Sequence, residues 1–389
     1  MYISAFPHRD ELFEITNRWL SDQLEEADPI RITRIITYDS FIAWETIQDF
    51  IGRLIPLLFE GAVFLRPIAT KKELKDFLCR SGHRRTTRIE ALINDYLRTP
   101  EYYYNSSPIA GLIYHDERDR ILSMCRFKRI KRTAEKASRY ASEFIHREVM
   151  AAAHPSLSKR LPAEVLEDPG VMADLVRAEK KVMEQIRENG LRLPVEIMTI
   201  RDVLGMKIVM DPPDEAELET AVLSLPGIEI VEKERHTGMY NAVHYIVDVP
   251  VDYSKLQKKF NSVAPAMNLS LRGLPVSGIT DDFLAFGATG YPAIQIDLIV
   301  TTYKELVESE IGRSMHEKRI FDQRQQQRFY GNIPKNIEYI IEYLLAVGLS
   351  PAVHIDEIPI KIWGRYLPDT LGFSVRQLFN MPEYSLIDT

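Results

Sequence analysis

Two aspartates that lead apolar, strand-like segments are the residues of this chain best suited to chemistry. Asp202 leads the segment 203–210, and Asp297 leads the segment 298–302. Between them, the segment 238–244 contains a tyrosine and a histidine. Mg²⁺ is usually bound by one or two carboxylates together with substrate phosphates. Asp202 and Asp297 are therefore candidate Mg²⁺ ligands and catalytic residues, and the pattern predicts nucleotidyl or pyrophosphoryl transfer.

Tyr240 and His244 are candidate substrate-binding residues between the two acids. Residues four apart in a strand point to the same face, and an aromatic ring there can stack on a nucleotide base. A simpler interpretation is that both side chains pack beneath the long connection 252–291. In the same way, the two acids can have structural roles, with Asp202 capping a strand turn and Asp297 facing solvent. The sequence leaves the functional and the structural interpretations open.

Several cations near these segments are candidate phosphate ligands. A predicted helix before the first acid carries Arg177, Lys180 and Lys181, while Arg235 and His236, just before Gly238, could supply another phosphate contact from a loop. Arginine binds phosphate through paired hydrogen bonds, and lysine acts as a point charge. A charged helix face is also commonly only solvated, so both interpretations stay open.

An α+β fold must position these residues. The hydrophobic pattern predicts helices laid on a small mixed sheet. We expect a mainly helical N-terminal domain (1–156) with a loop at 99–112, a sheet domain (157–330) with a boundary near 157–169, and a C-terminal α/β extension (331–389). Strands are expected at 203–210, 228–232, 240–249 and 294–300, with strand-like segments around 355–362; helices are expected at 71–80, 86–98, 171–188, 214–225, 334–347 and from 303 to about 327.

Composition and charge restrict the class of protein. The net charge of −7 argues against coating of nucleic acid by bulk electrostatics. The segment 126–147 is nevertheless strongly basic, and it is either a phosphate or RNA contact surface or a solvated helix face. Cys79 and Cys125 show neither metal-ligand spacing nor a disulfide framework, which favours a reducing cytoplasm.

Nothing in the sequence predicts a membrane partner. The N-terminal segment lacks the basic and apolar regions of a signal peptide. The most apolar stretch, 50–65, is too short and too charged to span a bilayer. We therefore expect a cytoplasmic protein, and the oligomeric state is left open.

The order of motifs across residues 170–320 resembles the synthetase domain of the RelA/SpoT family. The segment 202–207 matches the family's acid-led strand, and Tyr240 with His244 matches its tyrosine and histidine motif. The resemblance implies a nucleotidyltransferase fold with Mg²⁺ held by two acids. It also implies ATP as the donor of pyrophosphate and a guanosine nucleotide as the acceptor at its 3′-hydroxyl, as in (p)ppGpp synthesis. Cations on the helix before the first acid would then bind the donor phosphates.

The third family motif fits Asp297, because Glu310, Gly312 and His316 then fall at the family's offsets. In this resemblance Glu310 and His316 are mainly structural and hold the closing helix against the sheet. An alternative register places Ala293 at the position of the acid, which would remove the second metal ligand.

Departures from the family pattern support other functions. Thr301 replaces a basic residue of the third motif, and the Asn-Gly before Tyr240 is not intact, which would suit a catalytically degenerate module that binds a nucleotide or a partner protein. A third hypothesis is transfer to an RNA 3′ end, with the segment 126–147 as the RNA contact. His115-Asp116 supplies only part of a phosphohydrolase metal motif, and the sequence contains no phosphate-loop, dinucleotide or zinc-protease motif.

Overall fold

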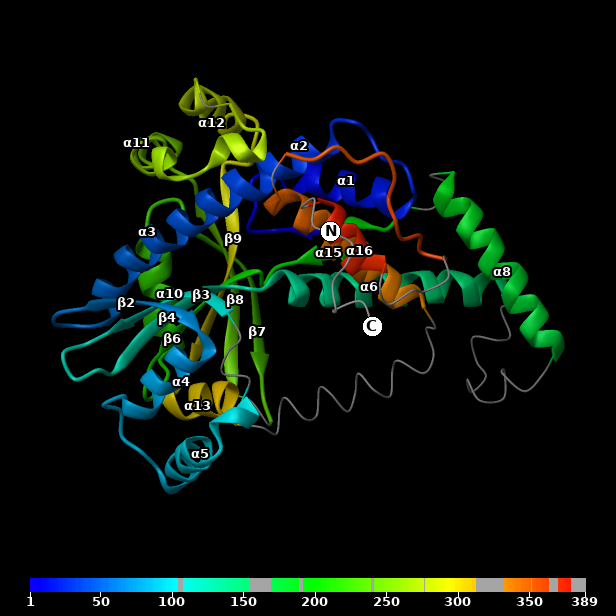
Figure 1. The fold of residues 1–389 in the computed structure, drawn as a ribbon. Helices are drawn as coiled ribbons and strands as arrows, with labels where there is room; N and C mark the ends of the chain where they lie inside the picture. Colours follow the sequence, from blue (N-terminus) through cyan, green and yellow to red (C-terminus); the bar gives the residue numbers. More distant parts are fainter. Residues whose placement is uncertain are drawn as a thin grey trace.

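The chain folds as an α+β protein around a seven-stranded mixed sheet flanked by helices (Figure 1). This computed structural model describes residues 1–103, 108–153, 169–188, 192–238, 241–275, 277–312, 332–350, 352–363 and 370–378. Within them the strand order is β2-β3-β4-β6-β9-β8-β7. Only β6 and β9 are parallel neighbours in this sheet, and the other described neighbours are antiparallel. The predicted fold class is confirmed at this level.

The elements follow in chain order. The strands are β1 (Tyr2–Ile3), β2 (Phe64–Thr70), β3 (Pro108–His115), β4 (Ile121–Phe127), β5 (Thr199–Ile200), β6 (Leu204–Val209), β7 (Glu229–His236), β8 (Ala242–Pro250) and β9 (Ala293–Thr301). The α-helices are α1 (Arg9–Leu20), α2 (Asp28–Arg34), α3 (Ser40–Leu58), α4 (Lys71–Arg80), α5 (Thr87–Arg98), α6 (Ile130–Ala153), α8 (Pro169–Arg187), α9 (Val195–Met198), α10 (Glu215–Ser224), α11 (Tyr253–Val263), α12 (Ile279–Gly287), α13 (Tyr303–Glu310), α15 (Ile333–Leu349) and α16 (Thr370–Leu378). Short π and 3-10 turns lie at Ile35–Asp39, Pro100–Tyr103, Ala264–Ala266 and Leu269–Arg272.

The first 156 residues contribute more than helices to the fold. The predicted helices α4 and α5 are present, but β2, β3 and β4 belong to the same sheet as β6 to β9. The predicted loop at 99–112 is wrong at its C-terminal end, where β3 begins. Most of β3 and β4 is buried on both faces, so these strands lack the alternation of apolar and polar residues that marks a half-exposed strand.

The four strands predicted between residues 203 and 300 are present as β6, β7, β8 and β9. The segment 355–362 was wrongly predicted as strand-like, because residues 352–363 form no strand and instead bury isoleucines against the core. The segment 157–168 of the predicted domain boundary lies outside the described residues. So does most of the helix predicted beyond Glu310.

The two faces of the sheet are covered differently. On one face, Leu298 and Val300 of β9 pack in the large core that also contains Ile47 and Phe50 of α3. On the other face, α4, α5 and α13 cover the β2, β3 and β4 side through a second core, and they lie together at the lower end of the sheet in Figure 1. Among the described residues, these three helices leave uncovered the part of this second face that carries Asp297 of β9 and His244 of β8.

Helix α6 forms the wall of that remaining space. It buries Ala134, Ala137 and Ala141, and it packs against α8 and α15 on the right of Figure 1. Its other face keeps charged residues, which is the pattern of an amphipathic helix with one apolar stripe.

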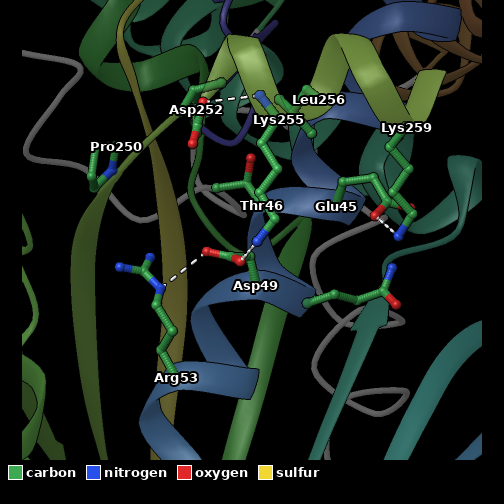
Figure 2. Close-up of a pocket in the computed structure, with 11 residues that line it drawn as sticks. Glu45, Thr46, Asp49, Arg53, Pro250, Asp252, Lys255, Leu256 and Lys259 are labelled. Atoms are coloured by element: carbon green, nitrogen blue, oxygen red, sulfur yellow. Dashed lines mark hydrogen bonds and ion pairs between the residues drawn. The ribbon is translucent and has the colours of Figure 1, made fainter. Parts of the chain in front are cut away.

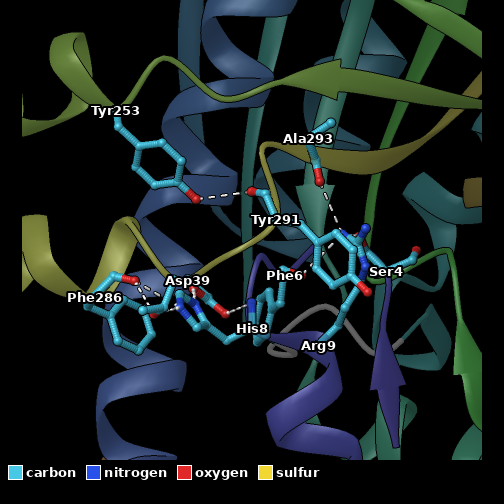
Figure 3. Close-up of polar contacts among 10 residues, drawn as sticks. Ser4, Phe6, His8, Arg9, Asp39, Tyr253, Phe286, Tyr291 and Ala293 are labelled. Atoms are coloured by element: carbon cyan, nitrogen blue, oxygen red, sulfur yellow. Dashed lines mark hydrogen bonds and ion pairs between the residues drawn. The ribbon is translucent and has the colours of Figure 1, made fainter.

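The long connection between β8 and β9 is anchored by a buried histidine (Figure 3). His8 Nδ1 lies 2.9 Å from Asp39 Oδ1, and His8 Nε2 lies 2.9 Å from the carbonyl oxygen of Phe286 on α12. The imidazole also stacks on the Phe286 ring at a centroid distance of 3.7 Å. These contacts join α12 to the N-terminus of α1 and to the start of α3.

Candidate functional site

Asp202 and Asp297 line the same cleft, which has a volume of about 640 Å³. The cleft lies on the open part of the sheet, with α6 and α9 on one side and β7 on the other. The sequence therefore predicted two acids that the tertiary structure does bring together. The lining residues are Lys136, Tyr140, Glu143, Arg147, Glu196, Ile197, Thr199, Arg201, Asp202, Glu232, Glu234, His236, His244, Ile246 and Asp297.

Asp297 lies on the floor of the cleft, on β9. The parallel register places it beside Gly205 of β6, and the antiparallel register places it beside Ile246 of β8. Asp297 is only 5% exposed, and its Oδ1 lies 3.2 Å from Nδ1 of His244. Because Gly205 has no side chain, the Asp297 carboxylate is not covered from the β6 side. In the alternative register, Ala293 would be the site residue, but it begins β9 opposite Pro250 and does not line the cleft.

Asp202 lies just before β6 and is bound by two lysines. Lys128 donates a hydrogen bond to Oδ2, and Lys136 Nζ lies 3.0 Å from Oδ1. Burial by itself raises the pKa of Asp202, but the two ammonium groups outweigh burial and hold that pKa below its ordinary value. Burial also lowers the pKa of Lys128. Asp202 is thus an ionised carboxylate in a local cluster of positive charge.

Sequence reasoning did not assign the polar face of α6 to the site. Lys136, Tyr140 and Arg147 line the cleft and come from the basic segment 126–147. The signal was present in the sequence, because Lys136 and Tyr140 lie four residues apart and Arg147 lies two turns further along the same helix face. What the sequence lacked was the packing partner that decides where this face points.

The cations predicted on α8 do not line the cleft. Arg177, Lys180 and Lys181 are exposed, and Arg177 binds Asp174 on its own helix. Arg235 also lies elsewhere, because it points from β7 toward α10, where its guanidinium is 2.6 Å from Glu215.

Two predicted binding residues do meet in the cleft. His236 and His244 both line it, and their rings meet edge to face at a centroid distance of 4.5 Å. The two histidines come from β7 and β8, at ladder positions two residues apart. Tyr240 lies outside the described residues.

Glu310 at the end of α13 forms ion pairs with two strands of the sheet that carries the site. Its carboxylate lies 3.2 Å from Nζ of Lys207 on β6 and 3.1 Å from Nη1 of Arg126 on β4. Burial by itself raises the pKa of Glu310, but the charges of Arg126 and Lys207 outweigh it and lower that pKa to about 2. These contacts hold the end of α13 against two strands, which agrees with the structural role expected for Glu310. His316 lies outside the described residues.

The walls of the cleft differ in charge. The α6 wall supplies Lys136, Arg147 and one acid, Glu143, whereas β7 supplies Glu234 and Glu232, the latter paired with Arg201. A phosphate group is attracted to the α6 wall and repelled by the β7 wall. The cleft can therefore orient a ligand that carries phosphates at one end and hydrogen-bond donors at the other.

The two carboxylates of the cleft can hold Mg²⁺ only if a bound ligand supplies further oxygen atoms to the ion. Within the described residues, no group of three histidine, cysteine or acidic side chains could hold a metal ion. Asp202 and Asp297 supply two carboxylates in one cleft, and Mg²⁺ commonly takes its remaining ligands from water and substrate phosphates. Asp202 is also bound to two lysines, so these would have to turn toward the phosphates.

A second groove lies between α3 and α11 and has a volume of about 580 Å³ (Figure 2). Its charged side chains bind one another. Asp49 binds Lys255 and lies 3.0 Å from Arg53, and Glu45 binds Lys259. None of the site residues predicted from the sequence lines it. The cleft with the two aspartates is therefore the better candidate for a functional site.

Comparison of the chain with protein-family models, curated proteins and solved structures finds no match. Among the described residues, no helix is both long enough and apolar enough to cross a membrane.

Proposed function

We propose that the cleft binds a nucleoside triphosphate and that the chain transfers pyrophosphate from ATP to the 3′-hydroxyl of a guanosine nucleotide. The observation that carries this proposal is the placement of Asp202 and Asp297 in one cleft with the cations of α6. Phosphoryl transfer depends mainly on positioning and on the stabilisation of charge, and these residues supply both. The resemblance of motifs to the RelA/SpoT synthetase domain supports the same reaction, and a nucleotidyltransferase fold is part of the proposal.

The residues of the cleft have separate roles in this reaction. Lys128 and Lys136 bind the phosphates of ATP, which replace Asp202 as the partner of the ammonium groups. His244 holds the Asp297 carboxylate in position, as its 3.2 Å contact suggests. The acceptor's 3′-oxygen forms a bond to the β-phosphorus of ATP, the bond from that phosphorus to the α,β-bridging oxygen breaks, and AMP and a proton leave. Mg²⁺, when bound by Asp202 and Asp297, neutralises charge on the phosphates.

A second candidate is a module that binds a nucleotide or a partner without catalysis. It is favoured by one observation, which is that each carboxylate oxygen of Asp202 contacts a lysine ammonium group. In such a module Asp202 would be a structural ion-pair partner. Thr301 in place of the family's basic residue supports the same alternative.

Product formation separates the two candidates. Wild-type protein is incubated with γ-³²P-ATP, Mg²⁺ and GDP, GTP or tRNA in separate reactions, and the products are resolved by thin-layer chromatography. A labelled guanosine product that disappears in Asp297→Asn supports the proposal, and a labelled tRNA identifies an RNA 3′ end as the acceptor instead. Asp356→Asn is the matched control, because Asp356 is an exposed carboxylate that does not line the cleft.

A folded wild-type protein that binds ATP but labels no acceptor would favour the binding module. A protein that binds no ATP at all would contradict the pyrophosphate transfer, and it would also argue against a module that binds ATP. Circular dichroism and thermal unfolding of each variant show whether a lost product reflects lost chemistry or a lost fold.

A further inference from the structure

One face of α6 carries four side chains that line the cleft at helical spacing. They are Lys136, Tyr140, Glu143 and Arg147. Residues three or four apart lie on the same face of a helix, so these positions form a single row along α6. With a rise of about 1.5 Å per residue, Tyr140 lies roughly 6 Å and Glu143 roughly 10 Å along the helix from Lys136. The row therefore presents a cation, an aromatic ring and a carboxylate in a fixed order.

The Lys136 end of this row lies beside the groups assigned to the proposed transfer. Lys136 Nζ is 3.0 Å from Asp202 Oδ1 and 5.7 Å from the centroid of the Tyr140 ring. A base that stacks on Tyr140 is thus held next to the carboxylate and the ammonium group that face the donor phosphates. The sugar of an acceptor nucleotide has to lie there, because its 3′-oxygen must reach the β-phosphorus of ATP.

Tyr140 offers a stacking surface inside the cleft. Its side chain is half-buried, and its hydroxyl has no hydrogen-bond partner within the described residues. The guanidinium carbon of Arg139 lies 5.1 Å from the ring centroid, so cations of α6 flank the ring. An aromatic ring stacks on the π-face of any base. Tyr140 can therefore hold a base, but it cannot select one.

Glu143 supplies the group that can select a base. Among the described residues, its carboxylate has neither an ion pair nor a hydrogen bond. Of the other glutamates that line the cleft, Glu232 binds an arginine, and Glu196 and Glu234 are exposed. Glu143 is instead half-buried and lies one turn from Tyr140. A ligand that donates hydrogen bonds to this carboxylate replaces the water that it loses on burial.

We propose that Tyr140 and Glu143 bind the guanine base of the acceptor and that Glu143 makes the site selective for guanine. This inference rests on the proposed pyrophosphate transfer, and it assigns the base to α6, outside the residues 170–320 on which the resemblance of motifs depends. An ionised carboxylate only accepts hydrogen bonds, and guanine presents two donors side by side, N1–H and the 2-amino group. Adenine presents one donor beside an acceptor nitrogen, which repels the second oxygen of the carboxylate.

Equilibrium binding of nucleoside diphosphates to the full chain tests the assignment. GDP, ADP and inosine diphosphate (IDP), whose base lacks the 2-amino group, are titrated by isothermal titration calorimetry. Mg²⁺ is present and ATP is absent, so no transfer can occur. The wild type should bind GDP about tenfold more tightly than IDP or ADP, because the missing donor leaves one oxygen of Glu143 unpaired.

Two substitutions separate the selection of the base from stacking. In Glu143→Gln a donor replaces one acceptor oxygen, so the preference for GDP over IDP should shrink to within about twofold. Tyr140→Leu should weaken the binding of GDP and IDP alike, each by about tenfold. Tyr140→Phe should restore both affinities, because stacking needs the ring and not the hydroxyl.

Glu148→Gln is the matched control for the loss of charge. Glu148 lies on α6 but does not line the cleft, so its replacement should leave the preference for GDP unchanged. Thermal unfolding of each variant, with and without GDP, shows that a weaker affinity is not the result of a lost fold.

Three results would overturn the inference. The first is a folded wild type that binds no GDP, or GDP binding that Glu143→Gln and Tyr140→Leu leave unchanged. The second is equal affinity of the wild type for GDP and IDP. The third is a loss of ADP binding but not of GDP binding in Tyr140→Leu, which would place the adenine of the donor on α6.

The proposed transfer fails by a different result. A folded wild type that binds GDP through Tyr140 and Glu143 but forms no labelled product from γ-³²P-ATP contradicts the transfer. The same result leaves the guanine site on α6 in place.

Discussion

His244 on β8 and Asp297 on β9 lie side by side on the floor of the cleft, with 3.2 Å between Nδ1 and Oδ1. They are 53 positions apart in the chain, and the antiparallel register of the two strands brings them together. A histidine that contacts a carboxylate in this way fixes the orientation of that carboxylate. The contact therefore gives His244 a positioning role in the proposed reaction.

Replacing His244 should slow the reaction more than it weakens binding. In His244→Phe the ring volume remains but the contact to Asp297 is lost, so we expect kcat to fall by about 10-fold to 100-fold. The Kd for ATP should change by less than about threefold, because the phosphates are assigned to the lysines. Steady-state kinetics and equilibrium binding measure the two quantities. His354→Phe is the control at an exposed histidine, and a loss confined to ATP affinity would contradict the positioning role.

Neutralising a cation of α6 should affect ATP binding, whereas neutralising a cation of α8 should not. Lys136→Gln removes a charge that lines the cleft, and we expect ATP affinity to fall by about tenfold or more. Lys180→Gln and Lys181→Gln change exposed positions on α8 and should leave affinity within about twofold. Equilibrium dialysis with labelled ATP compares the three variants. Stronger effects from α8 would mean that the phosphates bind outside this cleft.

Glu310→Gln should destabilise the fold by roughly 3–5 kcal/mol, because it leaves Lys207 and Arg126 without their shared carboxylate. Urea unfolding measures this change, and Glu357→Gln is the control at an exposed glutamate. The double variant Lys207→Met/Glu310→Leu should recover much of the loss, since it removes the buried charge as well as its partner.

The contribution of Glu310 should also depend on pH. Its pKa is lowered from 4.5 to about 2 in the folded protein, so the folded state favours the ionised carboxylate. This stabilisation is complete above pH 4.5 and is lost as the pH falls toward 2. The difference in unfolding free energy between the wild type and Glu310→Gln should therefore shrink across that interval. A difference that stays constant from pH 5 to pH 2.5 would contradict the assignment.

Gly205 should tolerate a methyl group but not a long side chain. A Cβ atom at Gly205 would lie 3.5 Å from the carbonyl oxygen of Asp297 and 3.9 Å from its Oδ2, which are ordinary contacts. Gly205→Ala should therefore fold normally and bind ATP within about twofold of the wild type, whereas Gly205→Leu should lose at least about tenfold by covering the Asp297 carboxylate. Binding and thermal unfolding are measured for both. Unchanged ATP binding by a folded Gly205→Leu would show that the ligand does not approach Asp297.

The sequence alone predicted the local elements that carry the two acids. Asp202 and Asp297 stand in or beside strongly apolar segments of strand length, and hydrophobic period and turn residues are local properties that can be read from neighbouring positions. The same reasoning located His244 on a strand, but it placed His236 in a loop, whereas β7 extends through His236. It did not reveal β3 and β4, because strands buried on both faces have no alternating pattern.

The tertiary structure decided which charged residues surround the acids. Lys128 and Lys136 lie 74 and 66 positions before Asp202, and nothing in their local sequence separates them from the exposed Lys180 and Lys181 on α8. The packing of α6 beside the sheet directs its basic face into the cleft, while the cations of α8 remain in solvent. An acid at the start of a strand is therefore predictable from nearest neighbours, but its counter-charges depend on how distant helices pack.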